Sequence, residues 1–502
     1  MKRDVLFLIR SLAMMAALML FAITVGLYLD VARSGFSTDK LSTFKYTEAR
    51  FLADVTNRGL NQVLAIAFTV VAIAVPLTAN LYSLKFLEFF IKDPVNATVL
   101  TLVVFADVAS ASVVYALKED LTPYIQLHFS FALLVLCLAV LFPYLYYIFR
   151  FLHPNTLLER PEDEINDNLR QAVHQPKKSA HYRKQVAEGI EHIANIAIRS
   201  VDRSDRNTAI ESVHTLERVA HAYWLVKKQM SDGWFDAEQI LFLGFSSKAV
   251  DEICRSHTWV EMKLFSQLRQ VMSAAVPKMH DLVSAIAKTL RRLGQVETAR
   301  HDAALREMAA DYFNTFIRMA IVRKDARSVF TLFDQYRTYA ESLNADYPEM
   351  VQEIAFYFEY YGQVARENGL TFIVESVAHD LGTLVQHAYQ YNARNQHKLL
   401  ERFLQYDFKA RPPLPGVKKA HALLASYLLL AGHTEESAQI GQSFAGLDPA
   451  FVYTIKDDLL HIKREKYWEI NERRINMDYV PDDQREKLRE FFEGLKRGEA
   501  GT

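Results

Sequence analysis

Cysteine is nearly absent from this sequence, because the 502 residues include only Cys137 and Cys254. A framework of disulfide bonds is therefore excluded as the source of stability. An excess of charge of one sign is also lacking, since 58 lysines and arginines face 59 acidic residues. This balance excludes a strongly basic nucleic-acid-binding protein and an acidic disordered chain.

Motifs that mark common enzyme classes are missing as well. The sequence has no Gly-rich phosphate loop of either standard spacing, no His-Glu-x-x-His and no Gly-x-Ser-x-Gly. We therefore expect no catalytic residue, no cofactor, no resident metal and no enzymatic activity.

What the sequence has is a sharp division between an apolar and a charged part. Residues 1–160 contain four long apolar stretches with 13 basic and 11 acidic residues, whereas residues 161–502 contain 45 and 48. A helix needs about 20 mostly apolar residues to cross the hydrocarbon core of a bilayer. We predict a membrane domain over residues 1–152, with spans at about 11–29, 63–81, 97–117 and 125–149.

The first stretch follows Lys2, Arg3 and Arg10, which is also the pattern of a cleaved signal peptide. The run is longer than a typical signal core and lacks a convincing small-x-small cleavage site, so we favour an uncleaved anchor. Four spans place both termini on one side of the membrane. Basic residues at the N-terminus and Arg150 favour the cytoplasm, although the basic first loop argues against it. We predict a multi-pass bacterial inner-membrane protein with both termini in the cytoplasm.

The first loop also contains an amphipathic segment, residues 41–60. Phe44, Phe51 and Val55 recur at helical spacing, with charged residues between them. Such a segment either lies in the membrane interface or packs on the spans. We favour packing.

Asp107 is the one carboxylate within the third stretch. A charge in the middle of a span is costly, so such a residue normally faces the helix bundle or water. The small residues around it would let another span approach, with Thr78, Asn80 or His128 as polar partners. Two interpretations remain open: an ion or proton path, and a neutral Asp107 that is hydrogen-bonded between helices, which we favour.

The segment after the second span resembles a known family. Residues 82–93 read YSLKFLEFFIKD, where the bacterial predicted-membrane-protein family catalogued as domain of unknown function family 2254 has Tyr-Ser-Pro-Arg-x-Leu-Arg-x-Phe-x-Arg-Asp. Leu84 and Glu88 depart from that pattern. The matching positions are Tyr82, Ser83, Leu87, Phe90 and Asp93, with Lys85 and Lys92 in place of arginines.

A second similarity to this family lies in the charged part, at Arg199, Asp205, Thr208 and Ala209. The resemblance covers about residues 45–260 in patches. It implies a membrane topology and no reaction. From its residue type, Asp205 is also expected to cap a helix, with Asp202 as the alternative.

The charged part is predicted to be all-helical, because apolar residues recur at steps of three and four and no strand pattern is evident. We expect a linker at 153–182, a helical domain at 183–300 and paired helices at 301–502. The pairs turn near Asp325, Gly369 and Gly432, and the last pair resembles a tetratricopeptide unit. A charged helix is expected to follow Pro481.

The sequence contains one weak pattern of candidate metal ligands. Glu211, His214, Glu217 and His221 share one side of an expected helix. A di-iron carboxylate site needs a second Glu-x-x-His and further glutamates, which are missing. A solvated or interhelical hydrogen-bonding face is the better interpretation.

Two further signals are weaker still. The pair His379-Asp380 lacks the separated partners of a histidine-aspartate phosphohydrolase. Cys254 lies beside Arg255, but a buried structural cysteine is a better interpretation than a reactive thiol.

The sequence therefore favours an integral membrane protein whose cytoplasmic helical domain is a protein-interaction or regulatory module. The alternative is a homo-oligomeric ion channel or transport component with Asp107 in the pathway. The expected partners are the lipid bilayer, further copies of the chain and a cytoplasmic protein, without nucleic acid.

Overall fold

The computed structural model describes residues 46–81, 93–119, 123–151, 154–406, 413–468 and 472–497. The side chains of residues 74–81, 124, 151–157 and 497 lie outside this description. Every regular element among the described residues is a helix, as the sequence predicts. The chain divides into two compact units, residues 1–161 and 162–502.

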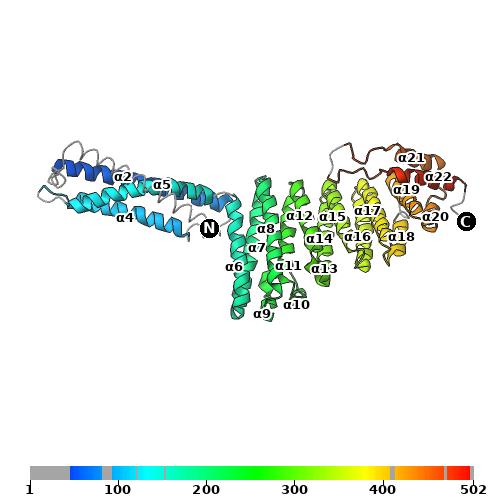
Figure 1. The fold of residues 1–502 in the computed structure, drawn as a ribbon, viewed down its shortest axis with the longest axis horizontal. Coiled ribbons are helices and arrows are strands. Elements are labelled where there is room, and N and C mark those ends of the chain that lie inside the picture. Colours follow the sequence, from blue (N-terminus) through cyan, green and yellow to red (C-terminus); the bar gives the residue numbers. More distant parts are fainter. Residues whose placement is uncertain are drawn as a thin grey trace. The chain divides into compact units, whose positions relative to one another are not determined.

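The first unit contains three described helices that pack on one another: α2 Tyr46–Leu81, α4 Pro94–Ala116 and α5 Tyr124–Phe151 (Figure 1). Buried positions alternate at steps of three and four residues, which is the spacing of helices wound as in a coiled coil. These positions are Ala49, Ala53, Thr56, Leu60, Val63 and Ala67 in α2, and Asn96, Val99, Val103, Ala106, Ser110 and Val113 in α4.

Small side chains make up much of the interior that α2 and α4 contribute, whereas α5 also buries large ones such as Leu127 and Tyr144. At Gly59 of α2, an added Cβ would lie 3.0 Å from Cδ1 of Leu134 in α5. The outward faces instead carry large apolar side chains, which is the arrangement expected of helices surrounded by lipid. Exposed ones include Phe51, Phe68, Ile73, Phe105, Val108, Phe129 and Phe142.

Two described helices are long and apolar enough to cross a membrane: Pro94–Ala116 and Ile125–Arg150. They correspond to the spans predicted at 97–117 and 125–149. The span predicted at 11–29 lies outside the described residues.

The span predicted at 63–81 and most of the amphipathic segment before it form one helix, α2. The side chains of α2 are described as far as Ile73. Ala49 and Ala53, in the amphipathic half, belong to the same buried cluster as Val113 and Leu127. The described part of the segment therefore packs on α4 and α5, but through these alanines: Phe51 and Val55 of the predicted apolar stripe are exposed, and Phe44 lies outside the described residues.

The second unit is an array of paired helices in two layers, which stand side by side in chain order (Figure 1). In one layer, called the inner layer below, α8, α12, α15, α17, α19 and α22 each pack on the next. The other layer is formed by α7, α11, α14, α16 and α18.

The bounds of its helices are α6 Pro154–His174, which begins before the unit boundary, η2 Pro176–Lys178, α7 Ser179–Asp202, α8 Arg206–Lys227, α9 Asp232–Phe235, η3 Gln239–Phe242, α10 Ser247–Arg255, α11 Trp259–Ala275, α12 His280–Gln295, α13 Glu297–His301, α14 Ala303–Val322, α15 Ala326–Leu343, α16 Pro348–Glu367, α17 Thr371–Gln390, α18 Gln396–Gln405, α19 Pro415–Leu430, α20 Thr434–Gln442, α21 Pro449–His461 and α22 Asp482–Arg497.

The turns between paired helices follow from local chemistry. The side chain of Asp325 accepts a hydrogen bond from the Ser328 backbone N at 3.1 Å and so caps α15. Gly369 and Gly432 have φ values of +81° and +87°, a region in which a side chain is strained. Asp205 caps α8 by accepting from the Thr208 backbone N at 3.2 Å, as predicted.

Two expected boundaries differ from the structure. The segment predicted as a linker, 153–182, is largely helical, with α6 and the start of α7. Prolines are tolerated in the first turn of a helix, and Pro154 begins α6. The expected division at residue 300 is also absent, because α12 packs on both α8 and α15 within a single unit.

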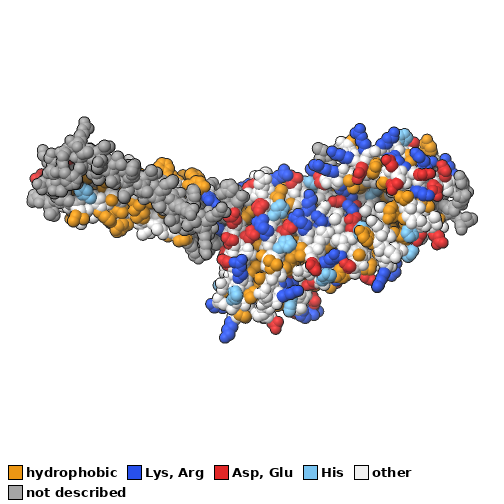
Figure 2. Space-filling model, viewed as in Figure 1, with side chains coloured by type: hydrophobic (Ala, Val, Ile, Leu, Met, Phe, Trp, Pro, Cys, Tyr) orange, Lys and Arg blue, Asp and Glu red, His pale blue; other side chains and the backbone are white. Residues whose placement is uncertain are grey.

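Large aromatic side chains form the core of this unit. Phe313 stacks on Tyr336 with ring centroids 4.7 Å apart, and Phe333 meets Phe358 edge to face at 4.9 Å. The surface carries charged side chains of both signs, whereas hydrophobic side chains cover much of the described surface of the first unit (Figure 2).

Candidate functional site

A long irregular segment crosses the inner layer of the second unit. Residues 462–481, called the strap below, lead from α21 to α22, and their described part contains no helix. The Asn476 backbone N donates to the Glu465 carbonyl oxygen at 2.7 Å, which joins the outgoing and returning arms. The strap therefore doubles back over the helices instead of continuing the array.

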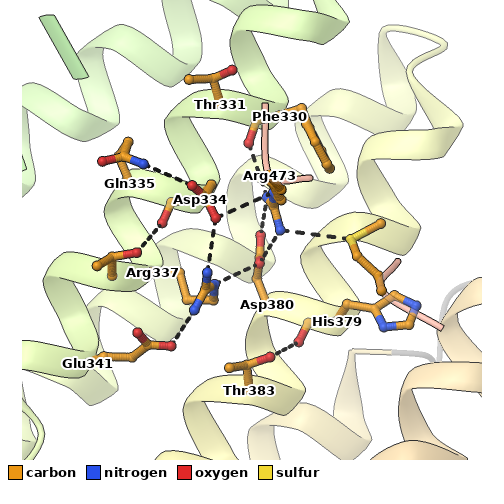
Figure 3. Close-up of polar contacts among 12 residues, drawn as sticks. Phe330, Thr331, Asp334, Gln335, Arg337, Glu341, His379, Asp380, Thr383 and Arg473 are labelled. Atoms are coloured by element: carbon orange, nitrogen blue, oxygen red, sulfur yellow. Dashed lines mark hydrogen bonds and ion pairs between the residues drawn. The ribbon is translucent and has the colours of Figure 1, made fainter. Parts of the chain in front are cut away.

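Arg473 fixes the returning arm to α15 and α17 (Figure 3). Its guanidinium donates to both carboxylate oxygens of Asp380, at 2.6 and 2.8 Å, and to the Phe330 carbonyl oxygen at 3.0 Å. It also lies 4.0 Å from the centre of the Phe330 ring. The side chains of Arg473 and Asp380 are only 3% and 2% exposed. This is a buried, bidentate ion pair, the geometry in which arginine binds carboxylate most specifically.

A second arginine extends this pair into a cluster. Arg337 of α15 donates to Asp380 at 3.1 Å and to Asp334 at 2.9 Å, and it also pairs with Glu341. The cluster therefore holds three carboxylates and two guanidinium groups. Burial raises the pKa of Glu341, and the charge of Arg337 opposes that rise.

Two histidine–carboxylate contacts hold the strap on either side of Arg473. Glu472 lies 3.0 Å from Nε2 of His280 and also pairs with Arg327. Burial would raise the pKa of Glu472, but the hydrogen bonds from Arg327 and the backbone and the charges of His280 and Arg327 together outweigh it, so this pKa is lowered. For His280, burial and the charge of Arg327 lower the pKa.

The other contact lies nearer α19. Asp478 is 3.2 Å from Nε2 of His379 and 3.0 Å from Nζ of Lys419. Burial opposes ionisation of Asp478, but the hydrogen bond and charge of His379 and the charge of Lys419 outweigh it, so its pKa is lowered. The strap is thus held by ion pairs and histidine–carboxylate contacts to four helices of the inner layer, α12, α15, α17 and α19.

A cavity of about 1090 Å³ lies between the strap and the helices. Its lining comes from the N-terminal parts of α15, α17 and α19, the end of α21 and the strap itself. Two large aromatic side chains in this lining remain exposed, Trp468 at 75% and Phe372 at 54%. Most of the charged side chains around them are already paired within the chain. What the cavity offers a ligand is therefore aromatic surface within a polar rim.

Of the polar residues predicted to meet within the membrane, the structure describes the side chains of Asp107 and His128 only. Asp107 lies on α4, half-buried, and its Oδ1 is buried without a hydrogen-bond partner among the described residues. His128 is an exposed residue of α5. Thr78 and Asn80 belong to α2, but their side chains lie outside the described residues.

Of the family motif at 82–93, only Asp93 is described. Tyr82, Ser83, Lys85 and Lys92 lie outside the described residues. Asp93 caps α4, accepting from the Val95 and Asn96 backbone N atoms at 3.0 and 3.2 Å. Its second oxygen accepts from the Tyr147 hydroxyl at 2.7 Å and from Arg160 at 3.2 Å. This buried carboxylate joins the start of α4 to the end of α5 and to Arg160 of α6.

The two glutamates of the weak metal signal, Glu211 and Glu217, form ion pairs with arginines. Glu217 accepts from Arg292 at 2.6 Å and from Thr289 at 2.9 Å, and Glu211 accepts from Arg218 at 3.0 Å. No group of three or more histidine, cysteine, aspartate or glutamate residues within the described part is arranged to hold a metal ion.

The other single-residue signals have ordinary surroundings. Asp380 is fully engaged by arginines, and His379 pairs with the strap. Cys254 is half-buried and donates to the Ala237 carbonyl oxygen at 3.5 Å. Arg199 is an exposed residue of α7.

Sequence reasoning missed Arg473, Glu472 and Trp468. The strap has no apolar periodicity, and the contacts of Arg473 with Asp380 and of Glu472 with Arg327 join residues 93 and 145 positions apart. A usable signal is the segment's lack of helical pattern between two helices, together with the adjacent aromatic residues Tyr467 and Trp468.

In the first unit, large apolar side chains cover the outward faces, and two helices are long and apolar enough to cross a membrane. These are features of a helical membrane unit. Residues 3–188 match the family described as "Predicted membrane protein (DUF2254)". This confirms the resemblance given by the motif at 82–93. The match ends before Arg199, Asp205 and Thr208.

Other comparisons add little. No curated protein matches the chain. A solved circular tandem repeat protein, described as having a novel repeat topology and enhanced subunit contact surfaces, shares 12% identity; the similarity covers 90% of this chain and 97% of that one. Its TM-score is 0.26, a level at which the likeness carries no argument.

Proposed function

We propose that this protein is a membrane-anchored interaction module, in which the second unit binds a protein partner at the cavity beside the strap. The observation that carries this proposal is the pair of exposed aromatic side chains, Trp468 and Phe372, in a cavity of about 1090 Å³. Aromatic side chains in such surroundings commonly dominate binding energy at protein interfaces. Stacked helical pairs also offer their inner layer as a binding surface.

The proposal includes a location and a topology. The first unit anchors the chain in the bacterial inner membrane, and residues 162–502 lie in the cytoplasm with both termini. Green fluorescent protein fused after Thr502 should fluoresce, because it matures in the cytoplasm and not after export through the Sec pathway. A second fusion carries alkaline phosphatase at the same position. A dark green fluorescent protein fusion together with an active alkaline phosphatase fusion would contradict this topology.

Photo-crosslinking in living cells tests the binding site. A benzophenone amino acid at position 372 or 468 should give the same discrete adduct with one cellular protein. The control position is Leu225 on α8, which is 80% exposed and does not line the cavity. Adducts of equal yield at all three positions, or none at 372 and 468, would contradict the proposed site.

A second function, transport by a homo-oligomer, is favoured by one observation. Oδ1 of Asp107 is buried on α4 without a hydrogen-bond partner among the described residues, and such groups within spans often lie on ion paths. Flux measurements on the purified protein in liposomes separate the two functions. An ion path requires a current that Asp107→Asn changes, whereas an interaction module gives no current with either chain.

A further inference from the structure

A second cavity lies at the C-terminal end of the array, away from the strap. It occupies about 580 Å³ between the turn after α20, the first half of α21 and the last turns of α22. Its α21 lining recurs at steps of three, one and three residues, which is one face of a helix: Pro449, Val452, Tyr453 and Lys456. Phe492, Leu495 and Lys496 supply the α22 side.

The lining is mostly apolar, and its charges have one sign. Besides the α21 and α22 residues, Phe444 and Leu447 contribute from the turn, and Gly446 allows that turn with a φ of +76°. Among the described residues, the charged ones in the lining are Lys456, which is half-buried, and Lys496, which is exposed. No acidic side chain lines the cavity among the described residues.

These two lysines differ from other cations of this unit. Lys419, for example, pairs with both Asp458 and Asp478 at 3.0 Å. Neither Lys456 nor Lys496 forms an ion pair with a carboxylate in the described part of the chain. A half-buried ammonium group without a carboxylate is favourable for binding an anion.

We propose that this cleft binds a single-chain anionic amphiphile, a long-chain fatty acid. Its acyl chain would lie against the apolar lining, including Val452, Phe492 and Leu495, and its carboxylate would pair with Lys456 and Lys496. The volume lies in the usual range for small-molecule sites, about 300 to 1000 Å³. A neutral ligand would leave both lysines without a counter-charge, and a small anion would leave the apolar lining uncovered. This site is independent of the proposed partner cavity.

Photoaffinity labelling of the full-length protein in nanodiscs of neutral phosphatidylcholine tests the proposal, because detergent would compete for the cleft. A palmitic acid that carries a diazirine and an alkyne is the probe. We expect label on peptides that contain residues 441–456 and 492–496, and competition by unlabelled fatty acids. Each added methylene should strengthen competition by about fourfold until the chain fills the cleft.

Two variants separate charge from shape. Lys456→Gln with Lys496→Gln should reduce labelling at least tenfold, and Val452→Trp should block it by filling the cleft. Lys487→Gln is the matched control, since Lys487 is on α22 but outside the cleft and pairs with Glu490. Circular dichroism and the urea midpoint establish that each variant is folded.

The result that overturns the proposal is specific. Equal labelling of the wild-type chain and the double lysine variant would show that the lysines do not recognise the head group. Equal labelling by the palmitic acid probe and by the corresponding alcohol probe would also show that the carboxylate is not recognised. Label spread over the first unit but absent from both cleft peptides would mean partition into the bilayer only, and would also exclude the site.

Discussion

The two units of this chain are both built of packed helices, but their outer faces carry different kinds of side chain, and α2 and α4 bury smaller residues than the second unit does. In the first unit, small residues such as Ala53 and Ala106 are buried, and Phe105 and Phe142 are exposed. In the second unit, aromatic residues such as Phe313 are buried, and charges cover the outside. The same helical geometry therefore serves two solvents, and the outer face shows which solvent each unit meets.

The units also differ in how they treat buried charge. The first unit has Asp93 in a single connected group with Tyr147 and Arg160. The second unit buries a cluster of five charges around Asp380 that joins α15, α17 and the strap. Charge pairs are used in the water-facing unit to fix long-range contacts between segments that the core does not join.

Removal of the central carboxylate should give the largest effect. Asp380→Ala leaves Arg337 and Arg473 buried without their shared partner, and we expect the free energy of unfolding to fall by about 3–5 kcal/mol. Trp224, Trp234 and Trp259 report unfolding of this unit in urea by fluorescence.

Asp167→Ala is the matched control for this prediction, because its pair with Arg170 is exposed, with side chains 77% and 72% accessible. Its effect should stay within about 0.5 kcal/mol. Equal effects of Asp380→Ala and Asp167→Ala would mean that burial of the cluster contributes nothing.

A charge on each outer face tests the comparison directly. Val108→Arg places a charge near the middle of α4, at a residue that is 63% exposed, and should cost about 2.5–3.5 kcal/mol of membrane insertion. Leu225→Arg, on the 80% exposed face of α8, should change stability by less than about 0.5 kcal/mol. Carbonate extraction measures insertion; unchanged insertion of Val108→Arg would remove the lipid-facing assignment of α4.

Close packing in the first unit predicts a smaller effect. Gly59→Leu forces side-chain atoms into Leu134 and should destabilise the helix bundle by about 1–3 kcal/mol. Gly494→Leu is the control, because nothing lies within 4 Å of an added Cβ there. Thermal unfolding in detergent should separate the two variants, and equal midpoints would contradict close approach of α2 and α5.

The smallest effect concerns pH and the strap. The pKa of His280 in the folded chain lies below its ordinary value of 6.5. At pH values near and below 6.5 the unfolded chain therefore binds more protons than the folded chain, and the strap should loosen as the pH falls below about 6.5. Glu472 and Asp478 have pKa values below 4.5 and 3.8, so their stabilisation is present above those values and is lost at lower pH.

Hydrogen exchange, corrected for intrinsic rates, measures this loosening at the Asn476 and Tyr479 amides. Both amides are hydrogen-bonded within the strap. Amides inside α15 serve as the reference. Protection of the strap amides that stays constant from pH 7.5 to 5 would contradict the role of His280.

Local patterns predicted much of the fold. The apolar runs identify α4 and α5, and Asp325, Gly369 and Gly432 mark the turns, because caps and left-handed glycines depend on near neighbours. The prolines of 153–182 favoured a linker, yet Pro154 begins α6, and the stripe of Leu158, Ile165 and Leu169 is buried. There the amphipathic pattern outweighed the prolines.

By itself the sequence determined the helical class, the apolar unit and the turns, since these depend on side chains a few residues apart. Only the tertiary structure decided the site. Nothing near Arg473 in the sequence indicates Asp380, 93 residues away, because a buried ion pair forms wherever folding brings two charges out of water together and leaves no periodic trace in either segment. The same holds for the cleft between α21 and α22, whose lysines are ordinary in sequence and become distinctive only when no carboxylate is placed beside them.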